Sequence, residues 1–181
     1  MEFLSALWMP IVVSAVLVWI ASFFMHMVFP HHKKEWGGLP DEAKFNSALE
    51  GVPAGQYMFP FGTMEDQKSP EFQAKMKAGP CGTLTLWPGP VNMGRNLVLT
   101  LLYYVLVGVF AAYVAWHGLG SGEQPYLLVF RVVGAVAFSA YGLGWMSHAI
   151  WYGWKGFWAD LFDGLVYALV TAGTFGWLWP H

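Results

Sequence analysis

The sequence predicts an all-α integral membrane protein, an antiparallel four-helix transmembrane bundle with a cytoplasmic loop that contains short helices. Hydrophobic residues make up 56% of the chain and charged residues only 11%, a balance outside the range of soluble domains. Four apolar stretches, 5–29, 95–117, 126–149 and 157–179, are each long enough to cross a bilayer, which takes about 20 helical residues. We therefore expect a single membrane domain over residues 1–181.

The positive charges predict how the bundle is oriented. Nearly all of the lysine and arginine residues lie in or beside the loops 30–94 and 150–156. Positive charge near the ends of spans is retained in the cytoplasm, so we expect these two loops inside and both termini outside. The net charge of −2 gives no basis for nucleic-acid binding, and Cys81, the only cysteine, excludes an intramolecular disulfide.

The first apolar stretch, 5–29, is predicted to be a retained transmembrane helix. It is longer than the core of a signal peptide and no basic residue precedes it. Ser14, Ser22 and His26 share one face of this helix, with His26 near its inner end. Polar side chains in a span point toward other helices, so we expect this face inside the bundle.

The loop 30–94 is longer than a simple connection. Residues 41–50 and 69–79 each carry the signals of a short helix, the second with Ser69 as its N-cap. Residues 51–62 between them are aromatic and broken by proline and glycine, so we expect no regular element there. Residues 83–87 alternate like a short strand.

The remaining spans are joined by short turns, so consecutive helices are expected to be antiparallel neighbours. Span three carries a seam of small residues that ends in an imidazole: Gly134, Ala137, Tyr141, Gly144 and His148. Span four carries a stripe of small residues, Gly164, Ala168, Ala172 and Gly176, beside a polar stripe of Asp160, Asp163, Tyr167, Thr171 and Thr174. Both stripes are expected to face protein, because helices in lipid associate through small and hydrogen-bonding residues.

The predicted topology brings four ionisable side chains to one depth, at the inner ends of three spans: His26, His148, Asp160 and Asp163. An ionisable group inside a span is costly unless it is paired, so this candidate polar layer is the main functional hypothesis. His31 and His32 lie just below the layer, and Tyr167 and Thr171 lie beside it; these four are secondary candidates.

Three interpretations of the polar layer stay open. The aspartates cap span four while the histidines hydrogen-bond across helices and stabilise the bundle. Alternatively, the layer is a protonatable cluster that supports proton-coupled movement of a solute. In the third interpretation, His26, His148, Asp160 and Asp163 bind zinc, iron or manganese, or His26 and His148 bind one haem axially.

Four segments resemble one known group of proteins: 26–32, with its His-Met-Val-Phe-Pro-His-His string, 38–42, 53–60 and 161–177. They are similar to a family of uncharacterised bacterial four-span inner-membrane proteins, and the likeness covers nearly the whole chain. The resemblance implies a bacterial plasma membrane and a shared four-span fold. It implies no activity and no catalytic residue.

The sequence leads to a non-enzymatic membrane protein as the first functional hypothesis, an accessory or scaffolding subunit of a membrane assembly that needs no cofactor. Its partners are the lipid bilayer and either another membrane protein or further copies of itself. The first alternative is a small oligomeric transporter or channel that uses the His/Asp layer. The second is a metal- or haem-binding membrane protein.

Overall fold

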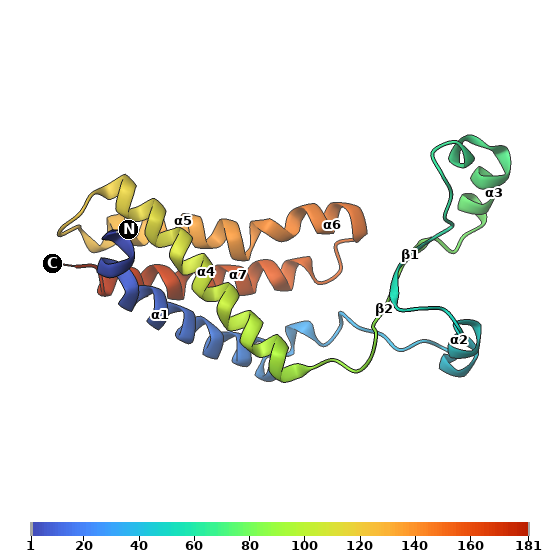
Figure 1. The fold of residues 1–181 in the computed structure, drawn as a ribbon, viewed down its shortest axis with the longest axis horizontal. Coiled ribbons are helices and arrows are strands. Elements are labelled where there is room, and N and C mark those ends of the chain that lie inside the picture. The colour runs from blue at the N-terminus through green and yellow to red at the C-terminus, as the bar shows by residue number, and fades with distance from the viewer. Residues whose placement is uncertain (1, 181) are drawn as a thin grey trace. The chain divides into compact units, whose positions relative to one another are not determined.

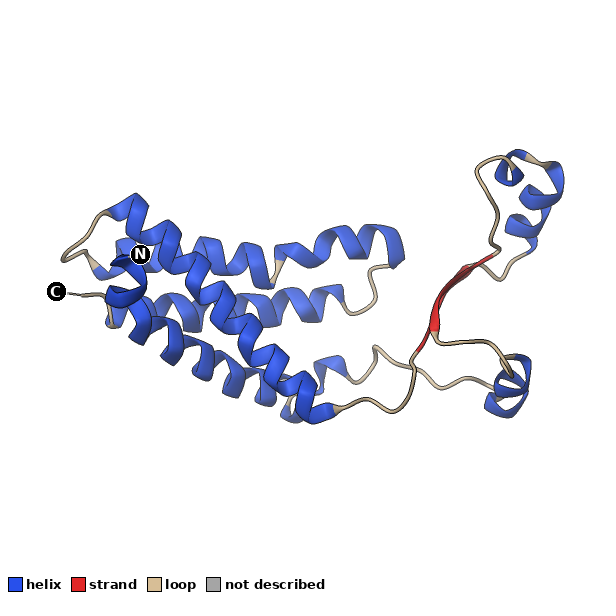
Figure 2. Cartoon of the chain, viewed as in Figure 1, coloured by secondary structure: helices blue, strands red, loops and turns tan. Residues whose placement is uncertain are grey.

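The computed structural model describes residues 2–180; Met1 and His181, the chain ends that the orientation prediction concerns, lie outside the described residues. The chain is mostly helical (Figure 2). It divides into two compact units: unit 1 comprises residues 1–37 and 94–181, and unit 2 comprises residues 38–93. We describe each unit by itself.

Unit 1 is a helical bundle of α1, α4, α5 and α7, in which α5 and α7 run side by side and α4 crosses them obliquely (Figure 1). Its helices are α1 (Glu2–Phe23), α4 (Met93–Leu119), α5 (Tyr126–Tyr141), α6 (Met146–Tyr152) and α7 (Phe157–Trp177). Hydrogen bonds tie neighbouring helices: Trp19 Nε1 in α1 donates to the carbonyl of Leu97 in α4, and Tyr103 Oη in α4 donates to the carbonyl of Ala140 in α5.

Within the described residues, three helical segments are long and apolar enough to cross a membrane: Glu2–Val28, Met93–Leu119 and Tyr126–Tyr152. They correspond to the first three predicted spans. The fourth predicted span forms α7, which is not among the three, because Asp160, Asp163 and its glycines and threonines lower its hydropathy.

Helix α7 packs against α5 and α1. The small-residue stripe of α7 faces protein, as predicted: Ala168 and Ala172 are buried, and Ala172 Cβ lies beside Gly134 of α5. The closest approach is at Gly164, where a Cβ atom would lie 2.6 Å from the backbone of Gly142. Glycine at position 164 is therefore what lets the two backbones meet.

Two of the helical segments are irregular. Helix α1 continues from Phe24 to Val28 as a π-helical turn, and a 3-10 turn, Pro30–His32, follows. After α5, a 3-10 turn over Leu143–Trp145 precedes α6; the span predicted over 126–149 is confirmed as the helical segment Tyr126–Tyr152, with this irregularity inside it. A 3-10 turn has three residues per turn instead of 3.6, so it rotates every later side chain about the helix axis.

Unit 2 contains α2 (Glu42–Ala48), β1 (Gly55–Phe59), a 3-10 turn (Asp66–Lys68), α3 (Pro70–Ala78) and β2 (Gly82–Leu86). Strands β1 and β2 pair antiparallel, with Tyr57 opposite Leu84. Both predicted helices are confirmed together with the predicted cap, since Ser69 Oγ accepts a hydrogen bond from the backbone N–H of Phe72. Figure 2 shows the two strands running between α2 and α3.

The predicted strand near residues 83–87 is confirmed as β2, but the prediction of no regular element in residues 51–62 is wrong. Strand β1 forms there because β2, distant in sequence, supplies its hydrogen-bonding partner. The two prolines, Pro53 and Pro60, lie outside the strand, and Gly55 is its first residue, so none of them interrupts the ladder. Local composition therefore gave the wrong answer for a strand whose partner lies beyond α3.

Candidate metal centre

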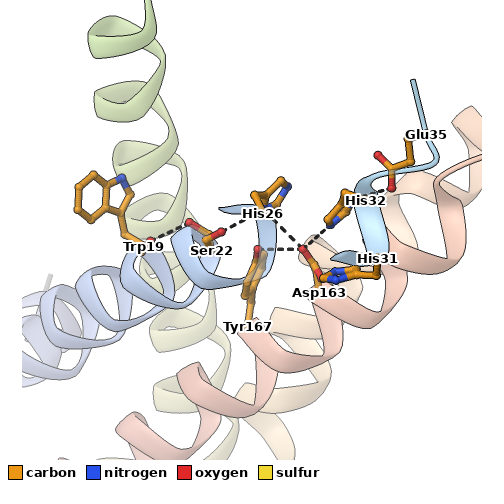
Figure 3. A network of polar contacts seen from close by, with 8 residues as sticks. All are labelled: Trp19, Ser22, His26, His31, His32, Glu35, Asp163 and Tyr167. Carbon is orange, nitrogen blue, oxygen red and sulfur yellow. Dashed lines mark hydrogen bonds and ion pairs between the residues drawn. The ribbon is translucent and has the colours of Figure 1, made fainter. Parts of the chain in front are cut away.

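A cluster of histidines and carboxylates lies in unit 1 where α1 ends and α7 begins (Figure 3). His26 comes from the π-helical turn, and His31 and His32 come from the 3-10 turn after it. Glu35 follows three residues later, and Asp163 projects from α7. One short stretch of chain thus supplies three imidazoles to one aspartate.

The backbone geometry of residues 24–35 explains this convergence. The N–H of Phe29 donates to the carbonyl of Phe24 at 3.1 Å, the i to i−5 bond of a π-helix, and single π-helical turns occur frequently at functional sites. Pro30 cannot continue the helix, and the chain turns so that the next two residues reach α7. The N–H of Glu35 donates to the carbonyl of His32, which closes the turn.

Asp163 is the centre of the cluster, and its side chain is only 4% exposed. His31 Nε2 lies 2.7 Å from Oδ1, and His32 Nε2 lies 3.0 Å from Oδ2. Tyr167 Oη donates to Oδ2 at 3.2 Å, and His26 Nδ1 is 3.7 Å from the same oxygen. A buried carboxylate is costly unless it is paired and hydrogen-bonded, and here the three imidazoles and the phenol meet that requirement.

His32 has a carboxylate at each ring nitrogen: Nε2 faces Asp163 and Nδ1 contacts Glu35 Oε1. Burial by itself lowers the pKa of His32. The hydrogen bonds to Asp163 and Glu35 and the charges of the two carboxylates outweigh burial, so the pKa lies above the usual 6.5. The two carboxylates therefore favour the imidazolium form of His32 more than water does, because an imidazolium can donate to one carboxylate from each nitrogen.

Glu35 is positioned by the start of α7. Gly156 is the N-cap of this helix and has φ +86°, a conformation that favours glycine. A Cβ atom at Gly156 would lie 3.3 Å from Glu35 Cδ, a tight contact that shows how close the carboxylate lies to the start of α7. The helix N-terminus favours negative charge, and Asp160 adds a second carboxylate in the first turn.

Some members of the predicted polar layer lie together in the structure, and others do not. The fold brings His26 and Asp163 together with the secondary candidates His31, His32 and Tyr167. Asp160 joins the same cluster beside His32 and Glu35. The other secondary candidate, Thr171, is buried one turn further along α7, and its Oγ1 donates to the carbonyl of Tyr167.

His148 does not join the cluster. Its side chain is exposed, and its ring contacts are with Trp145 and Tyr152 in its own segment. The 3-10 turn at Leu143–Trp145 changes the helical phase that had placed His148 in line with Gly134 and Tyr141. Glu35 is the one member of the cluster that the sequence interpretation missed; its i+3 spacing from His32 was the available signal.

The donor set fits a metal ion. Two triads of described residues have ligand atoms within 4.8 Å of one another: His26, His32 and Asp163, and His32, Glu35 and Asp160. In a tetrahedral site with bonds of about 2.1 Å, neighbouring ligand atoms lie about 3.4 Å apart. Around Asp163 Oδ2, the nitrogens of His32 and His26 lie 3.0 and 3.7 Å away, on either side of this value, whereas the 2.7 Å between His31 and Oδ1 is the length of a hydrogen bond.

The cluster is deep on one side and open on the other. Asp163 is buried, whereas the side chain of His26 is 54% exposed, so an ion has a route to the ligands past His26. Imidazole and carboxylate together are the ligands of zinc, iron and manganese sites. No known family, curated protein or solved structure matches this chain, so we infer function from the geometry.

Proposed function

We propose that the protein is a multi-pass membrane protein that binds a divalent transition-metal ion through His26, His31, His32 and Asp163. The observation that carries the proposal is the convergence of three imidazoles on one buried carboxylate. Neutral imidazole and ionised carboxylate suit zinc and iron. Such an ion acts as a Lewis acid or activates a bound water, and the open side at His26 gives water access to it.

Contacts outside the ligand atoms support a metal site. Metal-binding histidines usually donate their second N–H to a backbone carbonyl or a carboxylate, which fixes the orientation of the ring. His32 shows this arrangement, since its Nδ1 contacts Glu35 while its Nε2 faces Asp163. The Asp163 carboxylate is also held in position, because Tyr167 Oη donates a hydrogen bond to its Oδ2.

The membrane arrangement is part of the proposal. We place four spans in a bacterial inner membrane, with α7 as the fourth and the loops 30–94 and 150–156 in the cytoplasm. Helix α7 is less apolar than the others, but Asp163, Tyr167 and Thr171 are buried against protein. A polar stripe that faces the bundle does not meet lipid, which supports α7 as a span. The metal centre then lies at the cytoplasmic end of the bundle.

Native mass spectrometry of protein gently extracted from its own membrane tests the proposal. We expect the mass of a bound metal ion in the wild type and its loss in His32→Ala. His117→Ala is the matched control, because His117 is an exposed histidine whose Nδ1 bonds the carbonyl of Tyr113. His148→Ala is expected to retain the metal as well. Wild-type protein without metal, or loss in the His117 variant alone, would contradict the proposal.

The accessory-subunit hypothesis stays as a second proposal, and unit 2 supports it. Phe61, Met64 and Trp87 are 83%, 78% and 65% exposed, which is unusual for large apolar side chains outside a membrane span. The same mass spectra weigh partner subunits. A heterologous subunit that is lost in a Phe61→Ser, Trp87→Ser variant supports this role, and a monomer under gentle extraction contradicts it.

A further inference from the structure

Two potential metal positions share one histidine. The first triad is His26, His32 and Asp163, and the second is His32, Glu35 and Asp160. The shared residue has Nε2 3.0 Å from Asp163 Oδ2 and Nδ1 against Glu35 Oε1. The two ring nitrogens of an imidazole point away from each other, so each can hold a different ion.

We propose that the centre binds two divalent metal ions and that His32 bridges them as an imidazolate. This inference rests on the proposed function and extends it to a dinuclear site. The first ion is bound by His26, His31, His32 Nε2 and Asp163. The second is bound by His32 Nδ1, Glu35 and Asp160, with water completing its coordination.

The charges of the cluster support two ions. Asp163, Glu35 and Asp160 contribute three negative charges when ionised, and the His32 imidazolate contributes a fourth. Two divalent cations balance these four charges, while one leaves the site negative. Among the described residues, the ion pairs of Asp163 and Glu35 are with histidines and not with lysine or arginine.

The second position is as well organised as the first. Glu35 lies against Gly156, where an added Cβ would be 3.3 Å from its carboxylate carbon. Asp160 is in the first turn of α7, three residues before Asp163, so one helix face presents both aspartates to His32. Both Glu35 and Asp160 are only partly exposed, unlike a solvated acidic surface.

Binding of the second ion displaces a proton. With one ion on Nε2, neutral His32 keeps its N–H at Nδ1 and donates to Glu35. The second ion takes the lone pair that remains when this N–H bond breaks, and the proton passes to water. Metal ligands generally bind in their deprotonated form, so the second step releases one proton from His32.

The test is a titration of metal-free protein in detergent with Zn²⁺, followed by removal of free ion and metal analysis. We expect two ions per chain in the wild type and one in Glu35→Gln and in Asp160→Asn. Glu50→Gln, the same change in unit 2, is the matched control and is expected to keep two. Circular dichroism and size-exclusion chromatography of each variant show whether it has folded.

Cu²⁺ gives an independent measure of the bridge. Two Cu²⁺ ions on one imidazolate couple antiferromagnetically, so the wild type should show less EPR intensity than its copper content predicts. Glu35→Gln, with one copper, should recover full intensity. One ion per chain in folded wild type, or two that persist in Glu35→Gln, would overturn the dinuclear site but leave the proposed function. No ion at all would overturn both.

Discussion

At the scale of single residues, Asp163 and His32 determine what the cluster does. Asp163 is buried and accepts hydrogen bonds from His31, His32 and Tyr167, so its charge is compensated without a metal. When a metal ion binds, it replaces the protons on the imidazole nitrogens that face Asp163. The metal-free and metal-bound proteins therefore use the same side chains and depend on pH in opposite ways.

The stability of metal-free protein should fall as the pH rises. His32 has a pKa above 6.5 in the folded protein, because its hydrogen bonds to Asp163 and Glu35 outweigh burial. Protonated His32 thus contributes stability that is fully present below pH 6.5 and is lost as the pH rises through the folded pKa. The rings of His26 and His31 lie beside that of His32, with centroid distances of 4.5 and 4.2 Å.

Thermal unfolding in the presence of a chelator, from acidic to alkaline pH, measures this dependence. The melting temperature of the wild type should drop as the pH rises above 6.5, and that of His32→Asn should change less over the same range. His117→Asn should keep the wild-type slope. Equal slopes in all three proteins would show that His32 does not carry the effect.

Which residues belong to the cluster was only partly predictable. Spacing identified His26 and Asp163, because both are polar groups within or at the end of apolar helices. His31, His32 and Glu35 lie after the helix, and only the turn at Pro30 returns them to α7. Helical periodicity carries no information about a turn that folds back, so His31 and His32 were secondary candidates and Glu35 was missed.

At the scale of elements, helix irregularities decide which faces meet. The small-residue stripe of α7 was predictable because α7 is regular from Phe157 to Trp177. The seam of span three holds only as far as Tyr141, since the 3-10 turn after Gly142 changes its phase. A pattern with a period of 3.6 residues fails wherever the backbone leaves that period.

Gly164→Ala should destabilise the protein by about 1–3 kcal/mol, the usual cost of an overpacked contact. The new Cβ would lie 2.6 Å from backbone atoms of Gly142, and backbone cannot give way as a flexible side chain does. Because Asp163 is the neighbouring residue, metal affinity should fall as well. Thermal unfolding and Zn²⁺ titration measure the two effects.

Gly173→Ala is the control for this prediction. It makes the same change in the same helix, but its nearest atom is Tyr126 Oη at 3.6 Å, an ordinary contact. Alanine is the better helix former, so this variant should be neutral or slightly more stable. If Gly164→Ala were as stable as Gly173→Ala, the close approach of α5 and α7 would not be a constraint on the fold.

At the scale of the whole molecule, three apolar helical segments and a separate unit 2 define the organisation. Composition was sufficient to predict the three apolar helical segments, because the share of apolar residues in this chain exceeds the range of soluble domains. Composition was not sufficient to identify α7, because its polar residues are buried only through its packing against α5 and α1. The transporter alternative and the orientation of the chain stay predictions.

Cys81 gives a direct test of the orientation. It is the only cysteine and is exposed in unit 2, so a membrane-impermeant maleimide should label it in inverted membrane vesicles and not in intact cells. In a Cys81→Ser background, Ser121→Cys in the exposed turn between α4 and α5 should show the reverse. Labelling of both sites from the same side would contradict the four-span topology.

The separation of the ligands along the chain has a consequence for biosynthesis. His31 and His32 precede Asp163 by 132 and 131 positions, so the imidazoles and Glu35 leave the ribosome long before either aspartate. A nascent chain that has inserted only its first three helices holds every nitrogen ligand but not the carboxylate that gathers them. In the four-span, metal-binding protein that we propose, tight metal retention would begin only when α7 has been inserted and has docked. A bound ion would then distinguish a completed chain from one whose insertion has stopped early.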